Sequence, residues 1–173
     1  MKTRLLLLTP IIAALIASGC AKKETAPAAA SAAPAAKATP AAPAPKAGPR
    51  VIEITGNDQM KFSLTTIEAK AGEELKVVLT NVGMMPKEAM GHNWVLLKAG
   101  SDGMAFSTAA MAAKDTDYIP AALKGQIIAH TALIGPRKSD EVTFTVPPAG
   151  EYPFLCSFPA HFMVGMKGTL ISK

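Results

Sequence analysis

The chain has 173 residues, 49% of them hydrophobic, with two cysteines and a formal net charge of +5 at neutral pH. Six of its 18 basic residues but only one of its 13 acidic residues precede Arg50, so residues 50–173 carry 12 of each and are electrically neutral. A neutral domain offers no basic face to a phosphate backbone, which excludes a nucleic-acid-binding function. The length allows one domain with a substantial core.

Residues 1–19 have the organisation of a signal peptide. A basic start precedes the apolar run Leu5–Ala17, which is shorter than the roughly 20 residues that a membrane-spanning helix needs. The run leads into "ASGC", and small residues before a cysteine resemble the lipobox of bacterial lipoproteins. Cys20 is therefore the predicted lipidation site, at the periplasmic face of a bacterial membrane. Ala21 favours the outer membrane, and ordinary secretion into the periplasm is the alternative.

Residues 20–49 form a predicted tether behind the lipid-anchor cysteine. Between Ala21 and Pro49 the chain has 14 Ala and six Pro, and no Leu, Ile, Val or aromatic residue. Such a segment cannot bury enough apolar surface to offset its chain entropy, and the repeated Pro blocks a continuous helix. We expect a semi-stiff, extended tether that reaches at most about 90 Å in the polyproline II limit.

Short strands dominate residues 50–173. "EVTFTV" (Glu141–Val146) alternates strictly between apolar and polar residues, and "LKVVLTN" and "KFSLTTI" alternate more weakly. "NWVLLK", "QIIAHTALI" and "KGTLIS" are apolar runs of strand length, with Gly and Pro between them. Seven or eight short strands in about 120 residues indicate an all-β sandwich. An Ala- and Met-rich stretch predicts one small helical insertion, near Ala105–Lys114.

The second cysteine, Cys156, is the only thiol left once Cys20 is lipidated or removed. A lone cysteine in an exported protein should be paired, reactive or metal-bound. Its loop, "CSFPAHFMVGM", supplies a thiolate, an imidazole and a thioether with the spacing C-x4-H-x4-M, from Cys156 through His161 to Met166. One more imidazole would complete two histidines, one cysteine and a weak axial methionine, which is the ligand set of a blue-copper site.

His92 is the better candidate for the second imidazole. It stands in "MGHNW", just before an apolar run, where a strand should begin and where it can meet a loop at the same end of a sandwich. Gly91 has no Cβ and lets its backbone carbonyl approach a metal closely, and the family resemblance described below implies that this carbonyl is a weak axial ligand. His130 lies within an apolar run and is expected to be exposed or hydrogen-bonded. Soft sulfur ligands with two imidazoles favour one copper ion over zinc.

The segments "GNDQMKFSLTTIEAKAGEELKVVLTN", "MPKEAMGHNWVL", "IIAHTALIG", "DEVTFTV" and "FLCSFPAHFMVGMKGTL" resemble the azurins, bacterial members of the cupredoxin family, in the same order. The resemblance covers roughly residues 51–173. It implies an eight-stranded Greek-key sandwich with a helical flap, with His92, Cys156 and His161 as the strong copper ligands. It also implies that Asn93 ties the two ligand loops together and that Phe158 packs beside the site.

Three features depart from the azurin pattern. Four residues instead of three separate His161 from the predicted axial Met166, as in the similar auracyanins, and Met163 is a competing axial candidate. Asn81 stands where azurins commonly have a histidine near the site, which should weaken any pH response of the redox potential. Gly72 stands where azurins carry half of a disulfide, and the other half is absent too.

Several apolar residues are candidates for a docking rim around His161, through which a partner makes weak contact. The predicted docking rim is Phe162, Met163, Met85 and Met90.

The site lacks the features of an enzyme. No histidines flank Cys156 to bridge to a further copper cluster, the loop has no second cysteine, and nothing resembles the orienting group of a hydrolase. The sequence therefore predicts a one-electron carrier that cycles between Cu(I) and Cu(II), with no small-molecule substrate. Transient partners would be c-type cytochromes or reductases. The alternatives are a copper-storage or copper-delivery lipoprotein and a structural lipoprotein that merely kept the fold.

Overall fold

The structure is a computed structural model of the chain, and it describes residues 48–173. The predicted signal peptide, Cys20 and all of the predicted tether except Gly48 and Pro49 lie outside the described residues. Within the described part, no helix has the length and apolar character that crossing a membrane requires.

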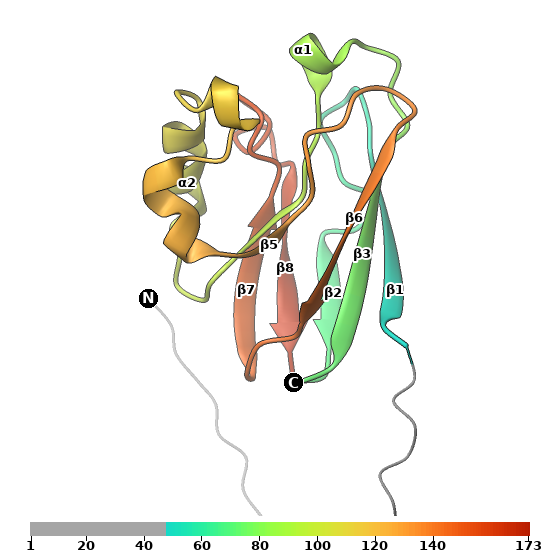
Figure 1. Cartoon of the computed structure of the whole chain (residues 1–173), viewed down its shortest axis with the longest axis vertical. Helices are drawn as coiled ribbons and strands as arrows, with labels where there is room; N and C mark the ends of the chain where they lie inside the picture. The colour runs from blue at the N-terminus through green and yellow to red at the C-terminus, as the bar shows by residue number, and fades with distance from the viewer. Residues whose placement is uncertain (1–47) are drawn as a thin grey trace, which may run out of the picture. The chain divides into compact units, whose positions relative to one another are not determined.

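The described residues fold into two β-sheets that face each other (Figure 1). One sheet has three strands in the order β1 (Arg50–Gly56), β3 (Glu74–Asn81) and β6 (Ser139–Thr145). The other has five, in the order β2 (Thr66–Ala69), β8 (Lys167–Ser172), β7 (Gly150–Leu155), β4 (Val95–Leu97) and β5 (Ile127–His130). The β1–β3 and β2–β8 pairs are parallel, and the other neighbours are antiparallel. The predicted eight-stranded sandwich is confirmed.

Alternation of side chains sets which face of each strand is buried. In β3, Leu75, Val77 and Leu79 are fully buried while the residues between them are not. Its neighbour β6 alternates between exposed and half-buried residues, and its half-buried Phe144 lies opposite Leu75 in the ladder. Because side chains on a strand point to opposite faces in turn, these apolar sets all point toward the second sheet.

The core between the sheets is centred on Trp94, which precedes β4 and is fully buried. Its ring stacks on Phe144 of the three-stranded sheet at 5.9 Å between centroids and packs at 5.5 Å against Phe154 of the five-stranded sheet. A second, smaller apolar cluster lies between the five-stranded sheet and the helical segments, and its buried members are Val95, Leu97, Phe106, Ile119, Leu155 and Phe162.

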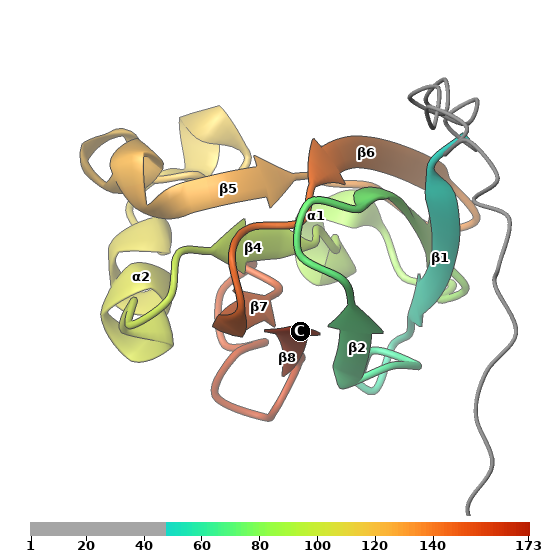
Figure 2. The same cartoon turned by 90° about the horizontal axis from the view of Figure 1, so that it is seen from below.

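The helical segments are short. The α-helices are α1 (Lys87–Met90) and α2 (Gly103–Ala110), and the 3-10 helices are η1 (Lys114–Thr116) and η2 (Ala121–Gln126). Helix α2 lies beside β4 and β5, at one side of the sandwich (Figure 2). It begins earlier than the predicted Ala105 because the Asp102 carboxylate accepts hydrogen bonds from the backbone N–H groups of Met104 and Ala105.

Several predicted strands are shorter in the structure. In "KFSLTTI" the strand begins only at Thr66, and the residues before it form a loop in which Phe62 bridges to Gly56. In "QIIAHTALI" the strand ends at His130, and Ile134 instead bridges to His92. Strands β1 and β7 lie outside the segments predicted above. In the two shortened segments, the residues left outside the strands form isolated bridges near the His92 end of the sandwich.

Candidate metal centre

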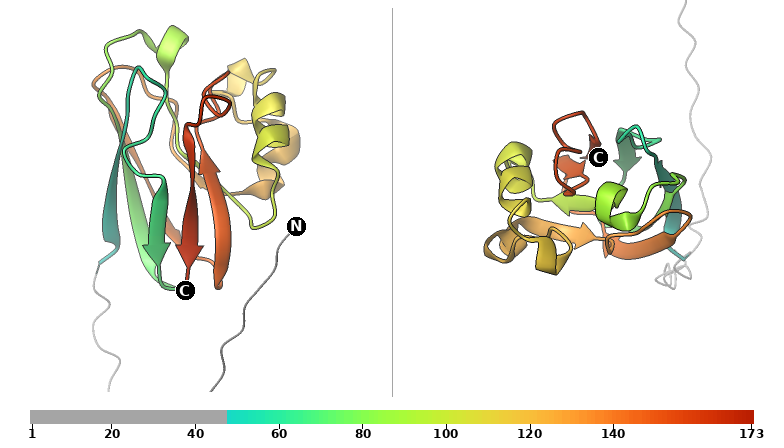
Figure 3. Two further views of the ribbon diagram at one scale, coloured as in Figure 1. Left: turned by 180° about the vertical axis from the view of Figure 1, so that it is seen from behind. Right: turned by 90° about the horizontal axis from the view of Figure 1, so that it is seen from above.

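Three metal-binding side chains meet at one end of the sandwich. His92 lies between α1 and β4 and is held by two backbone hydrogen bonds with Ile134, of 3.1 and 2.8 Å. Cys156 follows the last residue of β7, and His161 lies in the loop that joins β7 to β8. In the left view of Figure 3 this loop is drawn in red above β7 and β8, at the end of the domain away from the C-terminus.

The donor atoms of these residues converge on one point. The Nδ1 atoms of His92 and His161 lie 3.3 Å apart, and the Sγ atom of Cys156 lies 3.4 Å from Nδ1 of His161. One donor atom from each residue lies within 4.8 Å of the other two. Bonds of about 2.0–2.3 Å from nitrogen or sulfur to a metal place such donors roughly 3.3–4 Å apart. The spacing therefore fits one transition-metal ion held by all three residues.

Burial sets the protonation of the metal-free site. It raises the pKa of the Cys156 thiol to about 12. Burial also lowers the pKa of His161 to about 4, and the neighbouring His92 contributes to this decrease. The pKa of His92 is lowered by burial too, although Asn57 and Asp58 act to raise it. Both imidazoles are thus neutral near neutral pH and ready to bind, while the thiol needs a cation to displace its proton.

The ligand loop, Cys156–Met166, is closed by backbone hydrogen bonds. The Cys156 N–H donates to the Met166 carbonyl at 3.0 Å, and the Met166 N–H donates to the His161 carbonyl at 2.9 Å. Ala160 and Gly165 adopt positive φ values of 69° and 97°, which reverse the chain twice within the loop. The two hydrogen bonds of Met166 hold the end of the loop beside Cys156 and His161.

Of the two candidate axial methionines, only Met166 faces the site. It is fully buried, whereas Met163 is 64% exposed. A Cβ added at Gly56 would lie 3.0 Å from Cε of Met166 and 3.0 Å from Cδ2 of His92, so the thioether and the imidazole both border Gly56. The structure therefore favours Met166 as the axial donor.

The structure leaves no room for a side chain at position 91. A Cβ added at Gly91 would lie 2.7 Å from the carbonyl oxygen of Lys87. Its backbone is extended, with φ −67° and ψ 150°, so close approach and not an unusual φ is what requires glycine here. Coordination by the Gly91 carbonyl stays a prediction.

Asn93 and Phe158 lie where the resemblance implies. The Asn93 amide donates to Ser157 Oγ at 2.7 Å, and its oxygen accepts from the Ser157 N–H at 2.8 Å. The Phe158 ring lies 4.7 Å from the His161 ring between centroids, and Tyr118 packs edge-on against its other side at 5.0 Å. Asn93 thus joins the segment after His92 to the segment after Cys156.

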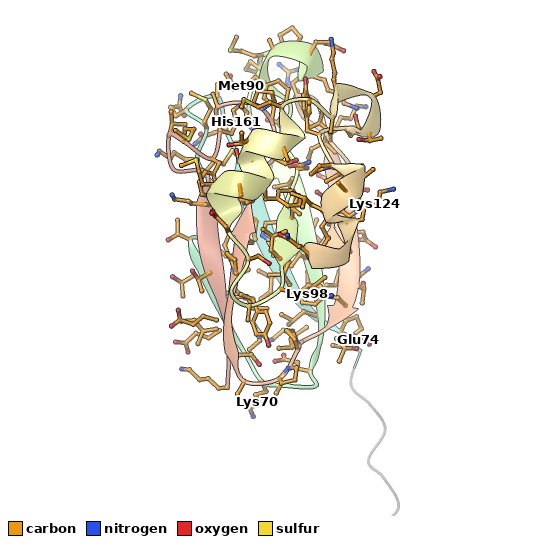
Figure 4. All side chains as sticks on the ribbon, turned by 90° about the vertical axis from the view of Figure 1, so that its left-hand side faces the viewer. Lys70, Glu74, Met90, Lys98, Lys124 and His161 are labelled. Carbon is orange, nitrogen blue, oxygen red and sulfur yellow. The ribbon has the colours of Figure 1, made fainter. Side chains whose placement is uncertain are left out.

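The predicted docking rim is only partly exposed. Met85 is 43% exposed, Met163 is well exposed and Met90 is half-buried. Figure 4 shows Met90 and His161 at the same end of the domain. Phe162 differs from the expectation: it is 9% exposed because its ring packs into the second apolar cluster, beside Gly103 at the start of α2. The Phe162 side chain therefore supports the loop from the interior and adds little to the exposed surface of the docking rim.

Two further residues singled out from the sequence, His130 and Asn81, form hydrogen bonds of their own. His130 is exposed at the end of β5, and its Nδ1 lies 3.0 Å from the Thr131 carbonyl. Asn81 is fully buried at the end of β3 and accepts a hydrogen bond from the Gly83 N–H. Within the described chain, Cys156 is a free cysteine and no other cysteine is present.

Two residues at the site were missed from the sequence, and both lie in or beside "GNDQM". Gly56 borders His92 and Met166, and Lys61 donates a hydrogen bond to the Val164 carbonyl in the ligand loop. A glycine that ends a strand and precedes Asn is a signal for close backbone approach. A surface lysine gives no comparable signal.

The sequence and structure are similar to those of known copper proteins. A sequence model of copper-binding proteins of the plastocyanin/azurin family matches residues 50–173. The azurin of Pseudomonas denitrificans is 43% identical over 132 residues, which cover 70% of this chain and 97% of that protein. The azurin of Alcaligenes faecalis is 38% identical over 123 residues, or 69% of this chain and 94% of that protein.

Solved structures of similar fold include two auracyanins. Auracyanin A of Chloroflexus aurantiacus, described as a "blue" copper protein, superposes with a TM-score of 0.65 at 31% identity, over 73% of this chain and 100% of that one. The reduced auracyanin of Roseiflexus castenholzii gives a TM-score of 0.64 at 32% identity, over 71% of this chain and 96% of that one.

Proposed function

Because the chain belongs to the plastocyanin/azurin family of copper-binding proteins, we propose that it carries single electrons between redox proteins at a bacterial membrane. A single copper ion is its cofactor. His92, Cys156 and His161 hold the ion, Met166 is the axial donor, and the Gly91 carbonyl is a second, weaker axial contact. When bound, copper supplies the Cu(I)/Cu(II) couple.

The convergence of two imidazole nitrogens and one sulfur within 4.8 Å carries this proposal. Thiolate and thioether suit Cu(I), and two imidazoles also suit Cu(II), so this donor set accepts both oxidation states. The donors are held by the closed ligand loop and by the paired hydrogen bonds of Asn93 with Ser157. Because these bonds fix the donors, little rearrangement accompanies a change of charge at the site.

Burial of the donors supports electron transfer over substrate chemistry. His92 and Cys156 are fully buried and His161 is 1% exposed. An enzyme needs an open position beside its metal, whereas an electron can tunnel through packed side chains. The chain is therefore proposed not to be an enzyme.

Contact with the electron donor and acceptor is proposed to occur over the exposed methionines near His161. Met85 and Met163 lie on the two segments that bear the ligands, and both are exposed. Flexible thioether side chains adapt to differently shaped partners, which suits brief encounters. Proteins such as c-type cytochromes or reductases are the proposed partners.

The attachment point of the predicted tether supports a membrane-bound carrier. Strand β1 begins at Arg50 and ends at Gly56, which borders His92. Seven residues of strand span about 20 Å. The described chain thus enters β1 at the end of the domain opposite the metal site, the same end as the C-terminus (Figure 1). We propose that Cys20 carries the lipid, at the periplasmic face and preferably of the outer membrane, and that Cys20→Ala releases the protein from membranes. Retention of that variant in the membrane fraction would exclude lipidation as the anchor.

A copper-storage or copper-delivery function is the second candidate, because exposed thioethers such as Met163 also bind Cu(I). Spectroelectrochemistry with and without a strong Cu(I) chelator separates the two. A carrier shows a reversible one-electron wave and keeps its copper over many cycles. A delivery protein instead loses copper to the chelator within the first reductions.

A further inference from the structure

Lys61 reaches the ligand loop from a distant part of the chain. It lies in the loop between β1 and β2, and its Nζ donates a hydrogen bond to the carbonyl of Val164, two residues before Met166. The two residues are separated by 103 positions in the sequence. Among the described residues, the Lys61 ammonium group forms no ion pair with a carboxylate, so the Val164 carbonyl is the one defined partner of that group.

Lys61 is the one donor from the described chain that reaches the Val164 carbonyl. The carbonyls of His161 and Phe162 accept the N–H groups of Met166 and Gly165, at 2.9 and 3.1 Å. In the described structure no backbone N–H donates to the Val164 carbonyl. An ammonium donor gives a charge-assisted bond, which is stronger than a bond between neutral groups.

The residue after Val164 leaves space for the lysine. Gly165 has φ +97°, and a Cβ at this position would lie 2.9 Å from the Lys61 Nζ. The loop therefore combines a backbone turn that favours glycine with a gap that the ammonium group occupies.

Lys61 is itself anchored beside the metal site. Its backbone N–H donates to the Asn57 side chain at 3.2 Å, and Asn57 directly follows Gly56, which borders His92 and Met166. In the same turn, the Asp58 carboxylate accepts the Met84 N–H at 2.8 Å. This turn thus holds the segment before His92 through Asp58 and the ligand loop through Lys61.

We propose that Lys61 is a positioning residue for the copper site. It fixes the segment Val164–Met166, so that the Met166 thioether stays at the site, and it places a positive charge beside the ligand loop. The role assigned to Met166 rests on the function proposed above. A nearby cation favours the less positively charged Cu(I) form and so raises the reduction potential.

Amide hydrogen exchange of the metal-free protein tests the positioning role without using copper. In Lys61→Met, the amides of Val164, Gly165 and Met166 should exchange roughly tenfold faster, as expected for the loss of one charge-assisted hydrogen bond. Lys61→Arg, which keeps a charged donor, should restore most of the protection. Lys70→Met is the matched control, because Lys70 is exposed at the opposite end of the domain from His161 (Figure 4).

The reduction potential of the copper-loaded protein provides the second measurement. Loss of the positive charge lowers the potential, whereas a Met166 thioether that is held less firmly raises it. The potential of Lys61→Met should therefore differ from the wild-type value, Lys61→Arg should restore it, and Lys70→Met should change it much less. Unchanged exchange at residues 164–166 in Lys61→Met, or equal effects of Lys61→Met and Lys70→Met, would overturn the proposal. A wild-type protein with no reversible copper couple would instead refute the proposed function. The hydrogen-exchange result on the metal-free protein would still show whether Lys61 holds residues 164–166 in place.

Discussion

Asn93 and Ser157 exchange two hydrogen bonds, of 2.7 and 2.8 Å, and both side chains are fully buried. Asn93 directly follows His92, and Ser157 directly follows Cys156. The two ligand-bearing segments, 64 positions apart, are therefore joined at the residues next to the ligands. A third bond, from the Asn93 amide to the Asp117 carbonyl at 3.3 Å, extends the connection to the end of η1.

Replacement of Asn93 by Ala should destabilise the metal-free protein by roughly 2–4 kcal/mol, because it leaves the Ser157 N–H and Oγ buried without partners. Urea unfolding followed by the fluorescence of Trp94, the single tryptophan and fully buried, measures this loss. Ser157→Ala and the double variant complete a thermodynamic cycle. Strictly additive effects in that cycle would contradict the coupling of the two segments.

The choice of axial donor predicts different results for two methionines. Met166→Leu should raise the reduction potential while preserving the intense colour, because a weak axial donor is lost and the strong ligands are kept. Met163→Leu should leave potential and spectrum unchanged, since that side chain is 64% exposed. Cyclic voltammetry of both variants checks this. The opposite pattern would show that Met163 and not Met166 is the axial donor.

Replacement of Gly56 by a residue with a side chain should disturb the metal site, although Gly56 itself contributes no side-chain ligand. The Cβ of Gly56→Ala would come within 3.0 Å of both His92 and Met166, so one of the two must shift. We expect weaker copper binding and a changed absorption spectrum. Gly125→Ala is the control, because a Cβ there meets nothing within 4 Å. A Gly56→Ala protein with the copper affinity and spectrum of Gly125→Ala would contradict the steric effect of a side chain at position 56 on the site.

Copper uptake should release about one proton per ion near neutral pH. The pKa of the Cys156 thiol is raised to about 12, so the thiol is protonated and must lose its proton to bind. Burial lowers the pKa of both ligand histidines, that of His161 to about 4, so they are already neutral and release none. As the pH falls toward 4, His161 also becomes protonated, and the affinity should fall more steeply.

Calorimetric titrations of copper in buffers of different ionisation enthalpy measure the proton release. Cys156→Ser should release almost no proton under the same conditions. Release of two protons by the wild-type protein near neutral pH would mean that one of the ligand histidines is charged in the metal-free state.

The sequence predicts the fold and the strong donors because both depend on local patterns. The alternation in Glu141–Val146 reflects the two faces of a strand, and it holds in β6. The spacing from Cys156 through His161 to Met166 confines three donors to one loop, so their proximity needs little knowledge of the rest of the fold. The prediction that His92 is the second imidazole ligand needed only one further inference, namely that a strand end and a loop can meet at the same end of a sandwich.

Long-range packing decides the features that the sequence did not reveal. The contact of Lys61 with Val164 joins residues 103 positions apart, and nothing near Lys61 in the sequence indicates it. The sequence predicts Phe162 at the surface beside His161, but its ring packs against the start of α2 at Gly103. The helix boundary is a local feature by contrast, because Asp102 caps α2 through the backbone N–H groups two and three residues after it.

The optical absorption of the purified protein during titration with Cu(II), compared with that of Cys156→Ser, tests the central claim most directly. A sulfur at position 156 that binds copper together with His92 and His161 should produce an intense thiolate-to-copper charge-transfer band that saturates at one copper per chain and bleaches reversibly on reduction. Cys156→Ser should lack the band. A colourless wild-type protein, or a variant that keeps the full band, would contradict the assignment.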